Sequence, residues 1–313
     1  MSPITNAPDS GISDTEFKCF IEHIRSCKFQ ILSINYLQGT DNFKLRHFLS
    51  LSSRKINVTC YILRSIKKIL KMSKLSDYSL LSFDVYGTLI DWEGGILTAL
   101  KPLTDQKDLK REQILEIYHD LEKEQQSKTP DMRYSELCTT IYPKFAERID
   151  LPAPSIQGAE AFGQSVGEWP AFEDTVDALK RLSKHYKLVV LSNVDKESFK
   201  SSNAGPLQGF PFDRIITAQE VGSYKPDQRN FEYMLKTVKE EFGVERSQVL
   251  QTAQSQFHDH HPAKKMGITS VWISRSGTMG NREEEVYQWK FATLDAMADA
   301  LEKELAPHEH VNS

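Results

Sequence analysis

Short apolar runs that each end in polar residues, with amphipathic helices between them, most constrain what this chain can fold into. The runs occupy residues 79–87, 187–193, 212–222, 247–255 and 270–275. Runs this short, bounded by turn residues, are typical of buried parallel strands. Helices are predicted between them, and two of these end at Gly243 and Gly267. Such alternation predicts an α/β fold, a Rossmann-like doubly wound parallel sheet with right-handed connections.

The alternation is interrupted once, after the first strand. Between Asp91 and about Pro170 the apolar residues recur at helical spacing, most clearly in 109–126 and 134–149. A helical insertion at this point would cover the carboxyl ends of the strands, where open α/β sheets bind ligands. We therefore expect an α/β core formed by residues 76–91 and 171–303, with a helical cap formed by residues 92–170.

The two ends of the chain differ in composition from the predicted core. Residues 42–76 contain nine Lys or Arg and no Asp or Glu, although the whole chain has a net charge of -4. We expect residues 1–75 to be an appended, basic, poorly ordered extension, and residues 304–313 to be a disordered tail. A targeting role for the extension, or a true start at Met72, is left open.

The cysteines and the hydropathy point to one kind of compartment. Three of the four cysteines lie in the extension, which is no disulfide framework and favours the reducing cytoplasm. No apolar run approaches the roughly 20 residues that a membrane helix needs. We expect no membrane span and, without an aromatic platform or groove-reading motif, no nucleic-acid partner. A homodimer is left open.

The first candidate site residue is Asp84, at the end of the first predicted strand. It is followed by Gly87 and Thr88. A carboxylate at a strand end, next to a glycine turn and a hydroxyl, can point one oxygen into a site while neighbouring N–H groups orient the other. Taken alone, the string is also compatible with a plain turn.

Two further candidates follow later strands. Ser192 and Asn193 come directly after the second strand, where a hydroxyl and an amide can hold an anionic group. Lys225 stands before Pro226 at a loop-to-helix junction, where its ammonium can neutralise both a nucleophilic carboxylate and an incoming anion. Each of these is weak evidence by itself, since a turn or a solvated lysine would look the same.

The fourth candidate is Asp259, after the strand at 247–255. It lies among His258, His260 and His261, a cluster that suggests zinc. Adjacent residues cannot easily all face one ion, and no distant partner with ligand spacing is evident. We therefore predict no metal site and expect Asp259 to face Asp84.

In this order, Asp84, Ser192, Lys225 and Asp259 resemble the haloacid dehalogenase superfamily over roughly residues 78–303. The string FDVYGTLID, the insertion after the first strand and SYKPD look most like its L-2-haloacid dehalogenase (type II) branch. The resemblance implies that Asp84 attacks the substrate to form an aspartyl ester, which water then hydrolyses. It also implies that Asp259 positions or activates that water, and that Thr88 and Asn193 belong to the site.

The residue at position 86 bears on which of two reactions of this superfamily the chain would catalyse. Its phosphatases usually have a second Asp two residues after the nucleophile, which protonates the leaving oxygen and helps to hold Mg²⁺. This chain has Tyr86 there. A halide leaves without a proton, so Tyr86 favours displacement at carbon without a cofactor.

Three departures from the dehalogenase pattern concern the substrate. Gln256 replaces the Asn of the family's Ser-Asn dipeptide, Phe231 replaces a Tyr, and no arginine stands where the first cap helix should supply one. Arg111 comes too early, and we expect Glu122 and Glu124 to face the site instead. We still predict that Tyr86 and Gln256 contact a small anionic substrate.

The sequence thus leaves three functions open. The first is a 2-haloacid dehalogenase-like hydrolase that acts through an Asp84 ester. The second is a Mg²⁺-dependent phosphatase in which Asp84 and Asp259 are the ligands. The third is a catalytically idle binding protein, since the same fold hosts many functions.

Overall fold

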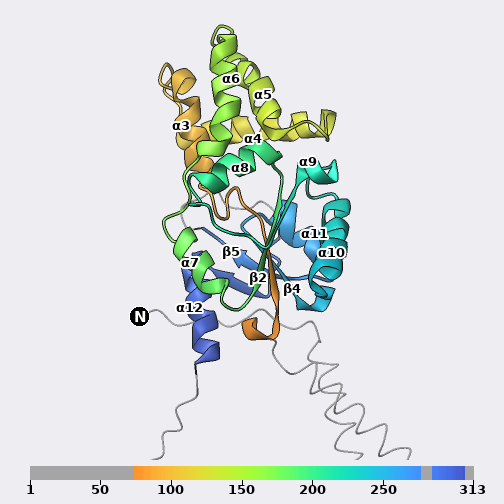
Figure 1. The fold of residues 1–313 in the computed structure, drawn as a ribbon. Coiled ribbons are helices and arrows are strands. Elements are labelled where there is room, and N and C mark those ends of the chain that lie inside the picture. Colours follow the sequence, from red (N-terminus) through yellow and green to blue (C-terminus); the bar gives the residue numbers. More distant parts are fainter. Residues whose placement is uncertain (1–73, 276–283, 307–313) are drawn as a thin grey trace, which may run out of the picture. The chain divides into compact units, whose positions relative to one another are not determined.

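The computed structural model describes residues 74–275 and 284–306 (Figure 1). Almost all of the extension expected at residues 1–75, and residues 307–313 of the expected tail, lie outside these ranges. Within the described ranges, no helix is both long and apolar enough to cross a bilayer.

Six strands form one sheet in the order β3-β2-β1-β4-β5-β6, and each neighbouring pair is parallel. They are β1 (Leu80–Phe83), β2 (Lys187–Ser192), β3 (Arg214–Thr217), β4 (Val249–Ala253), β5 (Thr269–Ile273) and β6 (Trp289–Phe291). The predicted doubly wound α/β fold is confirmed. The order reverses between β1 and β4, and the crevice at such a reversal is where these sheets bind ligands.

The last of the predicted strands, at 270–275, is not the last strand of the sheet, because β6 follows it. This strand has only three residues and lies at the edge of the sheet, where it pairs with β5 alone. So short a segment has too few residues to show the apolar pattern of a buried strand.

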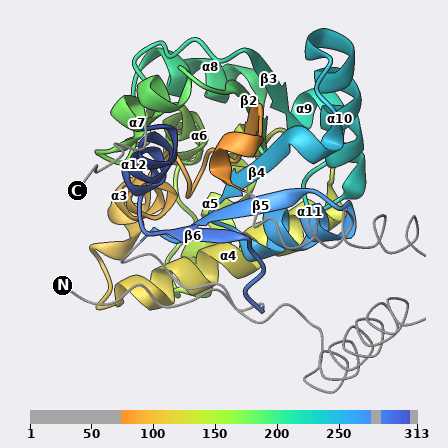
Figure 2. The same ribbon diagram turned by 90° about the horizontal axis from the view of Figure 1, so that it is seen from below.

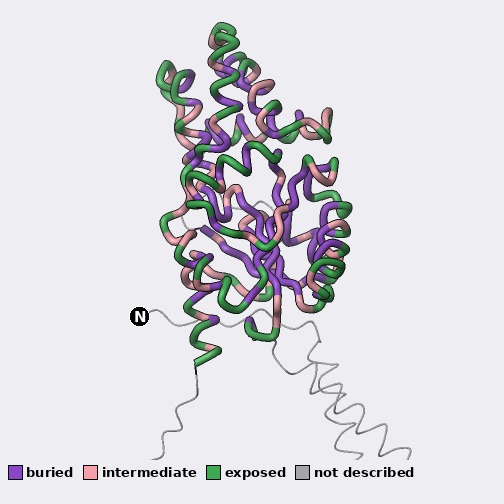
Figure 3. The backbone as a smooth tube through the Cα atoms, viewed as in Figure 1, coloured by how far each residue is buried: buried purple, intermediate pink, exposed green. Residues whose placement is uncertain are grey.

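Helices cover both faces of the sheet, and the strand residues alternate between two cores. Leu80 packs in the cluster that contains Phe231 and Met234 of α10 (Gln228–Phe242). Leu81 and Phe83 pack in the larger cluster with α7 (Thr175–Leu182) and α12 (Leu294–Leu305). Figure 2 shows α7 and α12 on one side of the sheet and α10 with α11 (His261–Lys265) on the other. The central strands β1 and β4 are accordingly buried along their whole length, and β2 and β5 along all but their first residue (Figure 3).

Between residues 92 and 170, a stretch that the structure describes throughout, there are helices and no strand. They are α3 (Trp92–Thr104), α4 (Arg111–Lys128), α5 (Tyr134–Arg148), α6 (Ile156–Gln164) and the 3-10 turn Ser165–Glu168. Figure 1 shows them at one end of the sheet. The remaining α-helices are α8 (Lys196–Ala204) and the short α9 (Ala218–Val221).

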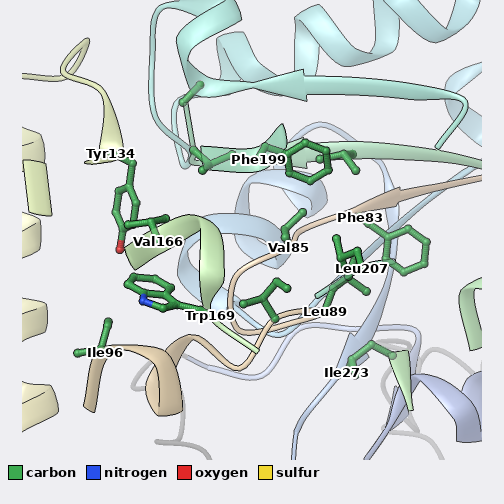
Figure 4. Close-up of a cluster of buried hydrophobic side chains, with 14 of the residues drawn as sticks. Phe83, Val85, Leu89, Ile96, Tyr134, Val166, Trp169, Phe199, Leu207 and Ile273 are labelled. Atoms are coloured by element: carbon green, nitrogen blue, oxygen red, sulfur yellow. The ribbon is translucent and has the colours of Figure 1, made fainter. Parts of the chain in front are cut away.

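An apolar cluster joins the helices of the insertion, residues 92–170, to the α/β core (Figure 4). Trp169 contacts two tyrosines edge-on, with ring centroids 5.8 Å from Tyr86 and 6.4 Å from Tyr134. Val85 and Leu89, which flank the turn after β1, lie in the same cluster. The loop that carries Asp84 is therefore packed between the sheet and the helical insertion.

Gly163 allows α5 and α6 to pack closely, which gives a test of the insertion's stability. A Cβ atom at this position would lie 2.5 Å from the carbonyl oxygen of Ser135 and would also collide with Thr139. We expect Gly163→Ala to lower the free energy of unfolding by about 1–3 kcal/mol, measured by urea unfolding. Gly158→Ala on the same helix is the control, because its Cβ would come no closer than 3.3 Å to a movable hydroxyl. Equal stability of the two variants would contradict this account of the packing.

Candidate active site

A cavity of about 220 Å³ lies where the carboxyl ends of the strands meet the helical insertion. Its core side is lined by Asp84, Tyr86, Gly87, Asp91, Phe172, Ser192, Asn193, Lys225, Gln254, Ser255, Phe257, His258 and Asp259. Its other side is lined by Trp92, Glu93, Leu115, His119, Glu122, Lys123, Gln126 and Tyr134 of α3, α4 and α5. A space of this size suits a small molecule.

Asp84 follows β1 directly and is fixed by two donors. The hydroxyl of Thr88 donates to its Oδ2 at 2.6 Å, and the ammonium of Lys225 donates to its Oδ1 at 2.9 Å. Gly87 has φ +94°, a conformation that favours glycine and turns the chain so that Thr88 returns towards the carboxylate. Thr88 itself is buried and does not line the cavity, so its part in the site is to orient Asp84.

Lys225 connects the two aspartates. Its Nζ donates to Asp84, to Asp259 at 2.7 Å and to the carbonyl of Leu191 at 2.8 Å, which uses all three protons. Burial opposes the charge, but the two carboxylates hold the pKa of Lys225 above its ordinary value. Asn193 accepts from the backbone N–H of Lys225 at 2.6 Å and donates to its carbonyl at 3.0 Å. The amide predicted to hold substrate thus also fixes the lysine.

Asp259 and Ser192 each present an oxygen that is not hydrogen-bonded. Asp259 accepts at Oδ1 from Lys225 and, at 2.9 Å, from Gln251 of β4. Burial raises the pKa of Asp259 to about 7 against the opposing effect of Lys225. Asp259 Oδ2 and Ser192 Oγ are buried and find no hydrogen-bond partner among the described residues. Both residues line the cavity, and these two oxygens keep hydrogen-bonding capacity that no described residue uses.

The histidines around Asp259 have separate surroundings. His260 Nε2 lies 3.0 Å from the carbonyl of Ala253, which can only accept, so this nitrogen carries the proton and Nδ1 accepts from Ser270. His258 lines the cavity, and its Nδ1 shares a hydrogen bond of 3.1 Å with the hydroxyl of Ser255. No group of three or more metal-ligating side chains occurs within residues 74–275 and 284–306.

His260 should make the protein sensitive to acid. Burial lowers its pKa to about 4, whereas an unfolded histidine titrates near 6.5. Below pH 6.5 the unfolded chain therefore binds a proton that the folded chain does not, and the free energy of unfolding falls by about 3 kcal/mol on reaching pH 4. His260→Gln should remove this part of the loss, measured by urea unfolding at pH 7.5 and 4.5.

The exposed His185 provides the control, because His185→Gln should leave the acid sensitivity unchanged. An unchanged pH dependence in His260→Gln would contradict the assignment.

Two of three expectations about individual residues need correction, and the third holds. Gln256 does not line the cavity, because its side-chain oxygen accepts from the backbone of Val286 at 2.8 Å, and Gln254 and Ser255 line the space instead. Glu124 does not face the site, since it is exposed beside Lys128. Glu122 does line the cavity.

Tyr86 lines the cavity, but its hydroxyl shares a hydrogen bond of 2.8 Å with Ser202. Burial raises the pKa of its phenol well above the ordinary value. The phenol therefore keeps its proton and is held by the core.

Two residues that support the site were not predicted. Gln251 is a polar side chain inside the buried strand VLQTA, and a buried amide of this kind signals a polar partner, which is Asp259. Arg275, after β5, donates to the carbonyl of Thr88 at 2.8 Å and pairs with Asp174 at 2.6 Å. It fixes the loop that carries the nucleophile.

Known proteins resemble this chain in sequence and in fold. A family model described as haloacid dehalogenase-like hydrolase matches residues 78–250, which is more than half of the chain. The chain belongs to the haloacid dehalogenase-like hydrolase family. It is therefore a hydrolase, and the predicted family resemblance is confirmed.

A curated relative of this hydrolase is the (S)-2-haloacid dehalogenase of Pseudomonas sp. strain YL, with 28% identity over 134 residues. The alignment covers 42% of this chain and 55% of the relative, so it spans about half of the relative's length.

Solved structures agree with the fold of this family member. A defluorinating L-2-haloacid dehalogenase has a TM-score of 0.62 at 16% identity, over 73% of this chain and 98% of its own. The L-2-haloacid dehalogenase from Xanthobacter autotrophicus, with chloropropionic acid covalently bound, has a TM-score of 0.60 at 17% identity, over 73% of this chain and 100% of its own. The putative HAD-hydrolase YfnB from Bacillus subtilis, bound to magnesium, has a TM-score of 0.58 at 16% identity, over 72% of this chain and 99% of its own. Identities this low establish the fold alone.

Proposed function

We propose that this hydrolase cleaves the carbon–halogen bond of a small 2-haloacid-like substrate through an ester on Asp84. An Asp84 oxygen attacks the halogen-bearing carbon, a carbon–oxygen bond forms, and the halide leaves with the electron pair of the broken bond. Water then attacks Cγ of Asp84, which releases the alcohol and a proton and restores the carboxylate. Support comes from the position of Asp84 in the cavity and from the dehalogenase names among the relatives.

The site offers separate support for each step. Thr88 and Lys225 hold Asp84 in one orientation and leave its carboxylate at the cavity wall. For the second step, Asp259 Oδ2 is the acceptor that we propose holds the attacking water. Its raised pKa would make it a better base than an ordinary aspartate.

The observation that carries the choice of reaction is the hydrogen bond between Tyr86 and Ser202. A phosphate ester needs a proton for its leaving oxygen, and the phenol at position 86 keeps its proton and is held by the core. A halide needs no such proton. We therefore favour displacement at carbon over phosphoryl transfer.

We also propose that the reaction needs no metal. Asp84 and Asp259 already share the ammonium of Lys225, which supplies the positive charge that a cation would bring. The Mg²⁺-dependent phosphatase is the second candidate, and the free Oδ2 of Asp259 is the observation that favours it. In that case Asp84 and Asp259 would hold the ion.

One assay separates these candidates. Chloride release from 2-chloropropanoate and phosphate release from p-nitrophenyl phosphate are measured with EDTA and with added Mg²⁺. We expect chloride release that persists in EDTA and no Mg²⁺-dependent phosphate release. Phosphate release that requires Mg²⁺, with no chloride from any haloacid tested, would overturn the proposal. No turnover of either kind would favour the idle binding protein.

The setting of the enzyme is also a proposal. We place it in the cytoplasm with a small molecule as its partner, and the buried free thiol of Cys138 is compatible with that.

A further inference from the structure

The part of the cavity formed by the helical insertion contains a buried carboxylate, Glu122 of α4. The residue is 7% exposed and lines the cavity. Its neighbour two positions along the helix, Glu124, is exposed to solvent. The two glutamates therefore have opposite surroundings although they belong to one turn of helix.

Glu122 is held in place by other residues of the insertion. Tyr134 donates to its Oε1 at 2.6 Å, and the Tyr134 hydroxyl also accepts from the indole of Trp92 at 3.1 Å. His119, one turn earlier on α4, has its Nδ1 3.7 Å from Oε2. Tyr134, Trp92 and His119 line the cavity as well. Oε1 is thus occupied, and among the described residues Oε2 has the longer contact with the half-exposed His119.

The charges around the cavity disfavour an anion at this end. The lining includes five carboxyl groups, on Asp84, Asp91, Glu93, Glu122 and Asp259, and two lysines, Lys123 and Lys225. Lys225 is already bound to two of the carboxylates, and Glu93 is paired with Arg111 of α4, which leaves Asp91 and Glu122 without a salt bridge to Lys or Arg among the described residues. Lys123 is exposed and lies 5.7 Å from the ring of Phe257, at the rim. A substrate carboxylate that pointed at Glu122 would meet like charge in a poorly solvated space.

A hydrogen-bond donor on the substrate would be favoured at the same place. A hydroxyl, amide or ammonium group that pointed at Glu122 could donate to a preoriented carboxylate, and hydrogen bonds to charged groups are among the stronger ones. A buried carboxylate also rejects ligands that leave it unpaired, which makes it a selective element.

We propose that Glu122 determines specificity by accepting a hydrogen bond from the substrate, so that the preferred substrates carry a donor where a plain 2-haloacid has its carboxylate. The proposal rests on the proposed function, since it names the substrate class for the same site. It predicts that an α-halo amide is a better substrate than the matching α-halo acid.

The test compares 2-chloropropanamide with 2-chloropropanoate, which have nearly the same size. The measured quantity is the ratio of kcat/KM for chloride release, amide over acid. We expect a ratio above one in the wild type and a ratio about tenfold lower in Glu122→Gln, the loss of about one charge-assisted hydrogen bond. Glu124→Gln is the matched control on the same helix, and its ratio should equal that of the wild type. Because both kcat/KM values come from the same variant, their ratio is unaffected by a general loss of stability or activity.

A binding measurement distinguishes a failure of this inference from a failure of the proposed function. The same compounds are titrated calorimetrically into Asp84→Asn and into Asp84→Asn combined with Glu122→Gln. Tighter binding of the amide that requires Glu122 supports the inference even if neither compound releases chloride, an outcome that would overturn the proposed function. A ratio below one in the wild type, or a ratio unchanged in Glu122→Gln, overturns the inference, as does the absence of binding by both compounds.

Discussion

Asp84→Asn is expected to abolish halide release, with a loss on the order of 10⁴-fold or more in kcat. The amide of asparagine fits the space of the carboxylate, but it is a poor nucleophile and forms no ester with the substrate. Thr88 and Lys225 would still surround the side chain, so the loss would come from chemistry more than from a displaced loop. Steady-state chloride release gives the measurement.

The control for this variant is Asp177→Asn, which removes an exposed carboxylate of α7. It should release chloride at the wild-type rate. Residual activity of a few per cent in Asp84→Asn would contradict the assignment of Asp84 as the nucleophile.

Lys225→Met should affect both activity and stability. The lysine is 1% exposed and touches two buried carboxylates, so its removal leaves their charges uncompensated. Breaking a buried pair in this way costs about 3–5 kcal/mol in the free energy of unfolding. We expect chloride release to fall by at least about 10³-fold, because Asp84 loses the donor that orients it. Urea unfolding and chloride release measure the two effects.

Two further variants show whether this loss arises from the uncompensated charges. Lys225→Met combined with Asp259→Asn should recover part of the stability without recovering activity, because one of the buried charges is gone. Lys236→Met, at an exposed lysine of α10, should leave both quantities unchanged. Wild-type stability in Lys225→Met alone would contradict the electrostatic account of the site.

The main parts of the site could be predicted because parallel strands bring their carboxyl ends to one edge. Asp84 follows β1, Ser192 ends β2 and Asp259 comes after β4, and although they are far apart in sequence they line one cavity. Lys225 lies in a loop, and taken alone it could be a surface lysine. Its order among the other three and the string SYKPD together indicated its place.

The errors about the site residues Glu124 and Gln256 came from the geometry of their helical turns. Residues two positions apart on an α-helix point to nearly opposite faces, so Glu122 and Glu124 could not both face the cavity. Gln256 begins a π-helical turn, Gln256–His260, which departs from ordinary helical spacing and directs Gln256 away from the cavity. A pattern read at 3.6 residues per turn does not reveal such a turn.

The supporting residues were missed for a related reason. Arg275 acts through contacts with Thr88 and Asp174, which are 187 and 101 residues away in sequence. A single arginine after a predicted strand carries no sign of such partners. Distant contacts of this kind follow from the packed fold and not from a local motif.

The most direct test of the central claim follows the oxygen that replaces the halogen. A single turnover is run in H₂¹⁸O with enzyme in excess over a chlorinated substrate, and the product and the peptide that contains Asp84 are analysed by mass spectrometry. If Asp84 attacks carbon and water then attacks the ester, the product contains unlabelled oxygen and ¹⁸O appears in the Asp84 carboxylate. If the product of this first turnover contains ¹⁸O while Asp84 remains unlabelled, water attacks the substrate directly and Asp84 is not the nucleophile.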